Sequence, residues 1–261
     1  MHPRTREQLR ALSLAFYEAH AQGFDASRAE LPWPGWERIV PLLPKRPLSV
    51  LDIGCGNGRF ARYLHAARRS DGTGLEFDYV GTDASEALLE AARARVPSDA
   101  APHCQWRVHD FLESETPGDD LPAGPFSLVV LMGVLHHVPG SEARLALLRA
   151  AARRVEPEGL LVFTAWQFAS RPRFDRRRVE WSTLGPVRGE AIDVGRLEAG
   201  DHLLRFGDDP KAPPRYCHQV SDEEFATWTG ALGLEAIADY RADGAEGDLN
   251  RYGIFRRAAS G

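Results

Sequence analysis

Several features that would place this chain in a special class of protein are scarce or absent. Only three cysteines occur in 261 residues, at Cys55, Cys104 and Cys217, and they show no paired spacing. Isolated cysteines in odd number indicate free thiols, which argues against a disulfide-stabilised secreted domain. No apolar run approaches the roughly twenty residues of a membrane helix, and no internal repeat or low-complexity segment occurs. The sequence therefore predicts a globular protein without membrane association.

The amino terminus and the charge balance narrow the class further. The first ten residues, MHPRTREQLR, contain no apolar segment of the kind that a signal peptide requires, so a cytoplasmic location is expected. Acidic residues outnumber lysine and arginine by 37 to 32, which gives a formal net charge of −5. Because nucleic-acid-binding proteins generally present a basic surface, this balance disfavours RNA binding, although a local basic patch is compatible with it.

The most informative stretch is VLDIGCGNG, residues 50–58. Its apolar residues predict a buried strand, and the turn that follows contains Gly54, Gly56 and Gly58, whose missing side chains allow a ligand to approach the backbone. Residues 59–69 then carry apolar side chains at helical spacing. A turn between any parallel strand and its helix can also need glycine, so the neighbouring motifs decide between the two interpretations.

The glycine loop, residues 54–58, differs from a dinucleotide-binding loop. The motif G-x-G-x-x-G has a third glycine that is replaced here by Arg59, so a pyrophosphate ligand is disfavoured. Asp52, at the carboxyl end of the strand, is also unfavourable beside a phosphate and favourable beside an ammonium group. The sequence therefore favours a zwitterionic amino-acid ligand.

Acidic residues also follow the next two predicted strands. The strand over residues 77–82 ends at Asp83, whose carboxylate can accept hydrogen bonds from both hydroxyls of a ribose. The alternative role for this region is a solvent-facing cap of the helix over residues 86–96. A third strand is followed by Asp110 and Phe111, which can hydrogen-bond and cover an adenine, although Phe111 taken alone is more typical of core packing.

The fourth predicted strand, residues 126–132, is a continuous apolar run suited to a parallel strand buried on both faces. It is followed by the adjacent histidines His136 and His137. Metal binding is disfavoured, because adjacent side chains point in different directions and no third histidine or cysteine lies nearby. One histidine is expected to be a hydrogen-bonded structural residue, and the other to line an acceptor pocket or act as a base.

Strands and helices alternate along the chain, which predicts an α/β fold built on an open parallel sheet. A fifth strand is expected over residues 160–165, and two more near the carboxyl terminus form an antiparallel pair. We expect four divisions, namely a helical lid, a ligand-binding core, a substrate-side insertion, and a helix with a strand pair that completes the sheet, over residues 1–46, 47–168, 169–216 and 217–261 respectively.

Together these motifs resemble those of the class I S-adenosylmethionine-dependent methyltransferases, over roughly residues 47–168. The resemblance implies a doubly wound, mostly parallel seven-stranded Rossmann-like sheet with an antiparallel carboxyl-terminal strand. In that family the glycine loop touches the methionyl part of the methyl donor, an acid after the second strand holds its ribose, and an acid after the third meets its adenine. By this resemblance S-adenosyl-L-methionine is expected to bind Asp52, Gly54, Cys55, Gly56, Gly58, Asp83, Ala84, Asp110, Phe111 and Met132.

The segment before the first strand resembles a narrower group within that family. FYEAHAQGFDASR at residues 16–28 and PWPGWERI at residues 32–39 are similar to the amino-terminal element of the eukaryotic methyltransferases that esterify carboxymethyluridine at the tRNA wobble position. By this resemblance Tyr17, Phe24 and Arg28 help close the site over the donor. An extra helix packed on the sheet is the alternative interpretation of this segment.

The insertion begins with RPRFDRRR, residues 171–178, in which five arginines outnumber one aspartate. Such a cluster can contact phosphates, and Phe174 and Trp181 could stack on bases. The alternative is a solvated loop.

Three functions are therefore carried forward. The first is methyl transfer to the carboxymethyl group of a modified wobble uridine in tRNA, with Arg28 or an arginine of the insertion anchoring the carboxylate. The second is O- or N-methylation of a small molecule, in which His136 or His137 assists a hydroxyl or amine acceptor. The third is a non-catalytic module that binds the donor or a partner. An activating protein partner is compatible with the sequence, which does not define an oligomeric state.

Overall fold

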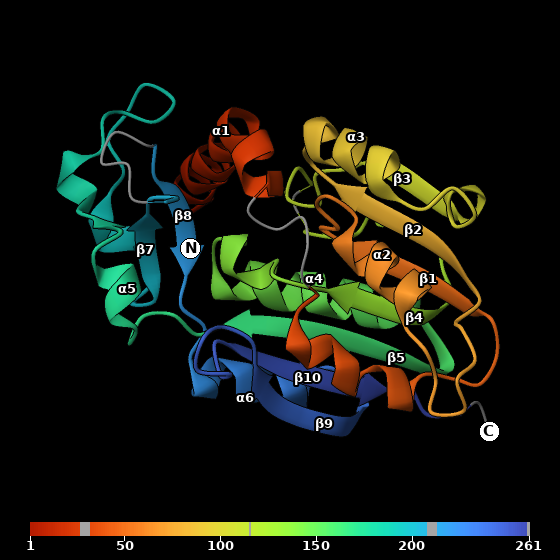
Figure 1. The fold of residues 1–261 in the computed structure, drawn as a ribbon. Helices are drawn as coiled ribbons and strands as arrows, with labels where there is room; N and C mark the ends of the chain where they lie inside the picture. Colours follow the sequence, from red (N-terminus) through yellow and green to blue (C-terminus); the bar gives the residue numbers. More distant parts are fainter. Residues whose placement is uncertain (27–31, 115, 208–212, 260–261) are drawn as a thin grey trace.

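The computed structural model describes residues 1–26, 32–114, 116–207 and 213–259, without the side chains of residues 21, 22 and 24–26 (Figure 1). Its centre is a seven-stranded sheet with the order β3-β2-β1-β4-β5-β10-β9. Strands β1 to β5 are parallel to one another, whereas β10 is antiparallel to both β5 and β9. The predicted doubly wound, mostly parallel sheet with an antiparallel strand at its carboxyl-terminal end is confirmed.

The strands of this sheet are β1 (Leu48–Ile53), β2 (Phe77–Asp83), β3 (Cys104–Val108), β4 (Phe126–Leu131), β5 (Val155–Trp166), β9 (Glu235–Ala242) and β10 (Asn250–Arg256). The helices are α1 (Pro3–Ala26), α2 (Arg59–Ala66), α3 (Glu86–Arg95), α4 (Ser141–Arg154), α5 (Pro172–Asp175) and α6 (Asp222–Ala231). Short 3-10 helices include η1 (Pro34–Arg38), η2 (Val40–Leu42) and η4 (Leu135–His137).

Two hydrophobic clusters lie on opposite faces of the sheet, because successive side chains of a strand point to opposite sides. On β1, Val50 belongs to one cluster and Leu51 to the other, and both are fully buried. Residues of α4 and α6 cover the face with Leu51, and residues of α2 and η1 cover the face with Val50. All six residues of β4 are buried, as its continuous apolar sequence predicts.

The insertion contains regular structure that its Pro- and Gly-rich composition did not indicate. Three short strands, β6 (Arg178–Val179), β7 (Asp201–Leu204) and β8 (Arg215–His218), form a separate antiparallel sheet. Figure 1 shows this small sheet beside α1, which lies between it and α3. Strand β8 crosses the expected division at residue 216, and the four divisions stay a prediction from the sequence.

A buried arginine joins the small sheet to the core. Arg144 of α4 is fully buried, and its guanidinium donates hydrogen bonds to Glu224 of α6 (2.7 Å), Glu198 of the insertion (2.5 Å) and the carbonyl of Val138 (2.9 Å). Two carboxylates and a carbonyl therefore accept hydrogen bonds from one buried cation. A buried charge is tolerated when it is paired and hydrogen-bonded in this way.

His218 of β8 extends the same network. Its Nδ1 lies 2.7 Å from Asp201 Oδ1, and its Nε2 lies 2.9 Å from Glu224 Oε2. Burial lowers the pKa of His218, but the hydrogen bonds to these carboxylates outweigh burial and raise the pKa above its ordinary value. Ligand atoms of Glu198, Asp201 and His218 lie within 4.8 Å of one another. Since both ring nitrogens of His218 already lie within hydrogen-bond distance of carboxylate oxygens, we interpret this cluster as structural.

Among the described residues no helix is both long and apolar enough to cross a membrane.

Replacing Arg144 tests the network. We expect Arg144→Met to lower the free energy of unfolding by roughly 3 kcal/mol, because Glu198 and Glu224 would keep their charges without a cation. Urea denaturation followed by circular dichroism measures this loss. Arg149→Met, at an exposed position of the same helix, is the matched control and should change stability by less than about 0.5 kcal/mol. Equal losses in the two variants would contradict this role for Arg144.

Candidate functional site

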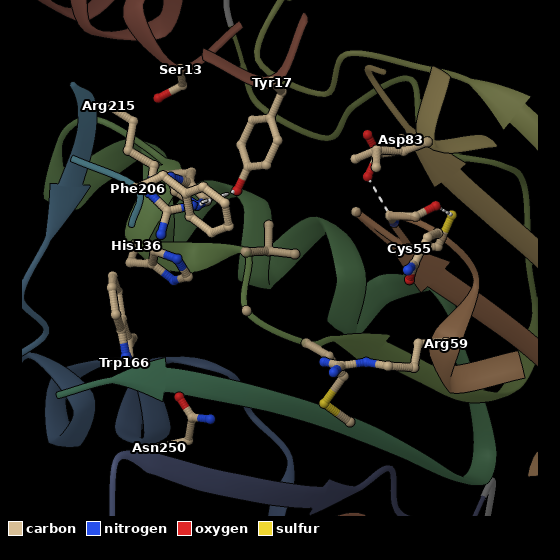
Figure 2. Close-up of a pocket in the computed structure, with 18 of the residues that line it drawn as sticks. Ser13, Tyr17, Cys55, Arg59, Asp83, His136, Trp166, Phe206, Arg215 and Asn250 are labelled. Atoms are coloured by element: carbon tan, nitrogen blue, oxygen red, sulfur yellow. Dashed lines mark hydrogen bonds between the residues drawn. The ribbon is translucent and has the colours of Figure 1, made fainter. Parts of the chain in front are cut away.

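A cavity of about 450 Å³ lies at the carboxyl ends of β1, β2, β4 and β5, and this volume falls within the range of small-molecule sites. Figure 2 shows Asp83 and Cys55 on one side of the view and Phe206, Arg215, His136 and Trp166 on the other. We call the part lined by Asp52, Gly56, Asp83, Ala84 and Asp110 the acidic end, and the part lined by Tyr17, His136, Trp166, Phe206 and Arg215 the arginine end.

Asp52 is the last polar residue of β1 and is buried at the acidic end. Tyr79 of β2 donates a hydrogen bond to its Oδ2, whereas Oδ1 has no partner among the described residues. Burial raises the pKa of Asp52 to about 7, opposed by the Tyr79 hydrogen bond. A buried carboxylate oxygen without a donor is costly, and a cationic ligand would supply the missing partner.

Asp83, at the end of β2, fixes the glycine loop. Its Oδ2 accepts a hydrogen bond from the backbone N–H of Gly56 (2.8 Å), and its Oδ1 accepts one from Ser85 (2.9 Å). Burial raises the pKa of Asp83 despite these two hydrogen bonds. The cap of the following helix is Ser85, whose side chain accepts from Leu88, so the cap interpretation belongs to Ser85 and Asp83 faces the cavity.

The three glycines of the loop have different structural roles. All three have positive φ, at 73° for Gly54, 55° for Gly56 and 68° for Gly58. A Cβ on Gly56 would meet nothing within 4 Å, whereas one on Gly54 would lie 2.5 Å from Val134 and one on Gly58 would lie 2.6 Å from Trp106. Gly56 therefore leaves space in the cavity, while Gly54 and Gly58 allow close packing. Gly58 does not line the cavity, although Cys55 does.

Asp110 and Phe111 follow β3, as expected, but Asp110 has a partner that the sequence did not indicate. Arg10 of α1 donates to its Oδ2 through Nε (2.8 Å) and Nη2 (2.5 Å), and its Oδ1 accepts from the backbone of Leu112 (2.9 Å). This ion pair attaches α1 to the acidic end. Phe111 lines the cavity and also belongs to the core, with 9% of its surface exposed.

The adjacent histidines lie on η4 and line the arginine end. His137 Nδ1 lies 3.2 Å from the carbonyl of Tyr216, and its Nε2 lies 2.8 Å from the hydroxyl of Tyr17. Because a carbonyl only accepts, Nδ1 of the neutral ring carries the proton and Nε2 accepts from Tyr17. His136 is buried and packs against Trp166 with ring centroids 4.7 Å apart.

The chain of hydrogen bonds continues beyond Tyr17. Arg215 of β8 donates to the Tyr17 hydroxyl through Nη1 (3.3 Å) and is 5% exposed. Its guanidinium lies over the rings of Phe16 (4.9 Å) and Trp166 (5.8 Å). Residues from α1, η4 and β8 are therefore held together at one end of the cavity.

Of the remaining predicted residues, Tyr17, Ala84 and Met132 line the cavity. Arg28 and the side chain of Phe24 lie outside the described residues. Sequence reasoning missed several lining residues that lie outside the predicted motifs, namely Trp33, Arg59, Trp166, Arg205, Phe206, Arg215, Asp243 and Asn250. Only Arg59 had a signal in the sequence, because it directly follows the glycine loop.

The fold and the acidic end of the cavity define the class of S-adenosylmethionine-dependent methyltransferases. The chain matches the model of a family described as "Methyltransferase domain" over residues 24–238, and it belongs to that family. Its cofactor is S-adenosyl-L-methionine.

Relatives with curated descriptions act on different acceptors. A region of 150 residues is 29% identical to the tRNA (carboxymethyluridine(34)-5-O)-methyltransferase of Macaca fascicularis and covers 58% of this chain but 19% of that protein. A region of 235 residues is 27% identical to the 27-O-demethylrifamycin SV methyltransferase of Amycolatopsis mediterranei and covers 86% of this chain and 78% of that protein.

Solved structures share the fold at low identity. A Burkholderia thailandensis 1,6-didemethyltoxoflavin-N1-methyltransferase aligns with a TM-score of 0.62 and 16% identity, covering 99% of this chain and 91% of that one. A Clostridium acetobutylicum S-adenosylmethionine-dependent methyltransferase aligns with a TM-score of 0.61 and 12% identity, covering 93% of this chain and 99% of that one.

Donor binding should depend on pH through Asp52. Below pH 7 this carboxyl is largely protonated, and an ammonium group beside it favours the ionised form, so binding of S-adenosyl-L-methionine releases a proton. We expect the Kd of the donor to fall roughly five- to tenfold between pH 6 and pH 7.5. This pH range lies below the pKa of an α-amino group, so the ammonium group of the donor stays largely protonated. Isothermal titration calorimetry measures this change.

Asp52→Asn is the control for this prediction. The amide cannot titrate, so the variant should bind the donor more weakly and with a flatter dependence on pH. The same steep dependence in the variant would show that another group is responsible.

Proposed function

We propose that the protein transfers the methyl group of S-adenosyl-L-methionine to a small-molecule acceptor held at the arginine end of the cavity. The observation that carries this proposal is the hydrogen bond between Tyr17 of α1 and Arg215 of β8, which are 198 positions apart in the chain and meet at that end. A cavity of about 450 Å³ bordered by a helix and a small sheet suits a compact ligand, whereas single-stranded RNA is usually bound in an extended basic groove.

The basic run at residues 171–178 supports the same choice. Arg171 forms ion pairs with Glu246 and Asp248, and Arg178 forms one with Asp175, so part of the positive charge is neutralised within the chain. Phe174, a candidate for stacking on bases, is 7% exposed and packs against Trp166 instead.

The acidic end provides a partner for each part of the donor. Asp52 Oδ1 would accept from the ammonium group, and Gly56 leaves the space that the methionyl chain needs. Asp83 would accept from the ribose hydroxyls, and Asp110 with Phe111 would contact the adenine. Arg59, a cation that lines the cavity beside Trp33, would bind the donor carboxylate.

When bound, S-adenosyl-L-methionine supplies a methyl group already activated by its positive sulfur. The residues of this chain therefore orient the acceptor, hold it close to the methyl carbon and exclude water, an effect that can lower the barrier by several kcal/mol. For a hydroxyl acceptor bound at Tyr17, the proton has a route to Nε2 of His137, which accepts from Tyr17. His136 packs at the wall of the same end and would orient the acceptor.

Methylation of a carboxymethyluridine in tRNA is the second candidate. What favours it is the 58% of the chain that aligns with the Macaca fascicularis enzyme and the similar alignment, at 25% identity over 154 residues, with the tRNA (carboxymethyluridine(34)-5-O)-methyltransferase of Saccharomyces cerevisiae. Arg28 would anchor the carboxylate in that case. The cytoplasmic location expected from the sequence is compatible with either candidate.

Radiolabelled methyl donor distinguishes the two candidates. The protein is incubated with the labelled donor and fractionated cell extract, with and without ribonuclease digestion of the extract. We expect label to enter a fraction of low molecular mass and to be insensitive to ribonuclease. Label confined to RNA would establish the second candidate and exclude the first.

Asp83 tests the proposed binding mode of the donor. We expect Asp83→Ala to weaken donor binding by roughly 1.5 to 3 kcal/mol, because charged hydrogen bonds to the ribose and to Gly56 are lost. Calorimetry measures the Kd. Asp78→Ala, at an exposed position of the same strand, is the matched control and should leave the Kd unchanged. An unaltered Kd for Asp83→Ala would rule out the ribose role.

A further inference from the structure

We propose that the acceptor is an aromatic carboxylate whose negative group is bound by Arg215 and Arg205 at the arginine end of the cavity. This inference rests on the proposed function and names the class of its substrate.

No carboxylate of the described residues balances the charge of Arg215. Its side chain is almost completely buried, and no described residue places a carboxylate within ion-pair distance of it. Its contacts include the Tyr17 hydroxyl, the thiol of Cys217 and the faces of Phe16 and Trp166. Arg144, which is equally buried, has two carboxylate partners. In this protein a buried guanidinium with a structural role, that of Arg144, is therefore paired with carboxylates.

A buried cation without a counter-ion is strongly unfavourable, and a hydroxyl with two aromatic faces compensates it only in part. Arg215 lines the cavity, so an anion bound there can provide the missing charge. Figure 2 shows the Arg215 side chain beside Tyr17 and Phe206. The geometry therefore makes this arginine a binding group for a ligand.

A second arginine lies on the same wall. Arg205 follows β7 and lines the cavity, its backbone N–H donates to the carbonyl of Arg177 (2.9 Å), and no described carboxylate pairs with its side chain. Two guanidinium groups suit the two oxygens of one carboxylate. A phosphate monoester, with a charge of about −1.5 to −2 and three oxygens, is the alternative anion, and binding measurements distinguish the two.

The rest of this end suits a flat apolar body. Trp166 and Phe174 meet edge to face with centroids 5.1 Å apart, and His136 covers another side of Trp166. Phe206 adds a further ring to the wall. Aromatic rings bind flat, apolar surfaces without needing polar partners, and they exclude water from the charged group beside them.

Calorimetry with matched ligands tests the proposal. Full-length protein saturated with S-adenosylhomocysteine is titrated with benzoate, 3-phenylpropionate, 1-naphthoate and indole-3-acetate, each compared with its neutral amide and, for the phenyl and naphthyl bodies, with the phosphate monoester. We expect at least one carboxylate to bind about 10- to 100-fold more tightly than its amide, the effect of a charged hydrogen bond. Arg215→Met and Arg205→Met should each remove most of this preference.

Arg196→Met, in an exposed ion pair of the insertion, is the control and should keep the full preference. Binding of S-adenosylhomocysteine is measured for every variant, because a variant that has lost its fold does not bind it. If a variant has lost its fold, only the preference of the unmodified protein for carboxylates over amides tests the proposal. Equal affinity for acids and amides throughout, or tighter binding of the phosphate esters, would overturn this inference while leaving the proposed function intact. Failure of the unmodified protein to bind S-adenosylhomocysteine would instead refute the proposed function.

Discussion

The structure depends on one hydrogen bond at the acidic end, from the backbone N–H of Gly56 to Asp83 Oδ2 (2.8 Å). It attaches the glycine loop after β1 to the end of β2, so that the ends of these two paired strands form one wall of the cavity. The bond keeps Asp83 at the cavity although burial raises its pKa. Asp52, one strand away, lines the same cavity, and its Oδ1 has no hydrogen-bond partner in the described part of the chain. The proposed donor site therefore consists of two carboxylates and a backbone turn.

The arginine end of the cavity is held together by different interactions. Here side chains bring together α1, η4, which follows β4, and β8 of the insertion. Arg215, Tyr17, His137 and the carbonyl of Tyr216 form one chain of hydrogen bonds. The Arg10–Asp110 ion pair fastens the same helix to the acidic end. Helix α1 therefore completes both halves of one cavity.

The sequence predicted the sheet and the acidic end because both follow from local patterns. Continuous apolar runs fix β1 and β4, and acids placed directly after strands must lie at the carboxyl edge. At the arginine end the sequence indicated Tyr17, His136 and His137 but not Arg215, because Arg215 meets Tyr17 only through the folding of an insertion whose strands are four residues or fewer. Nothing near Arg215 in the chain distinguishes it from the arginines at 171–178, of which Arg171 and Arg178 form ion pairs.

The two ends of the cavity carry side chains of opposite charge. Carboxylates line the end proposed for the donor, whose ammonium and sulfonium groups are cationic, and guanidinium groups line the end proposed for the acceptor. A positive sulfur bound between these ends would experience repulsion from Arg215 unless an anion intervenes. A carboxylate bound by Arg215 would offset that repulsion. The charges of the two ends therefore suit a cationic donor and an anionic acceptor that are bound together.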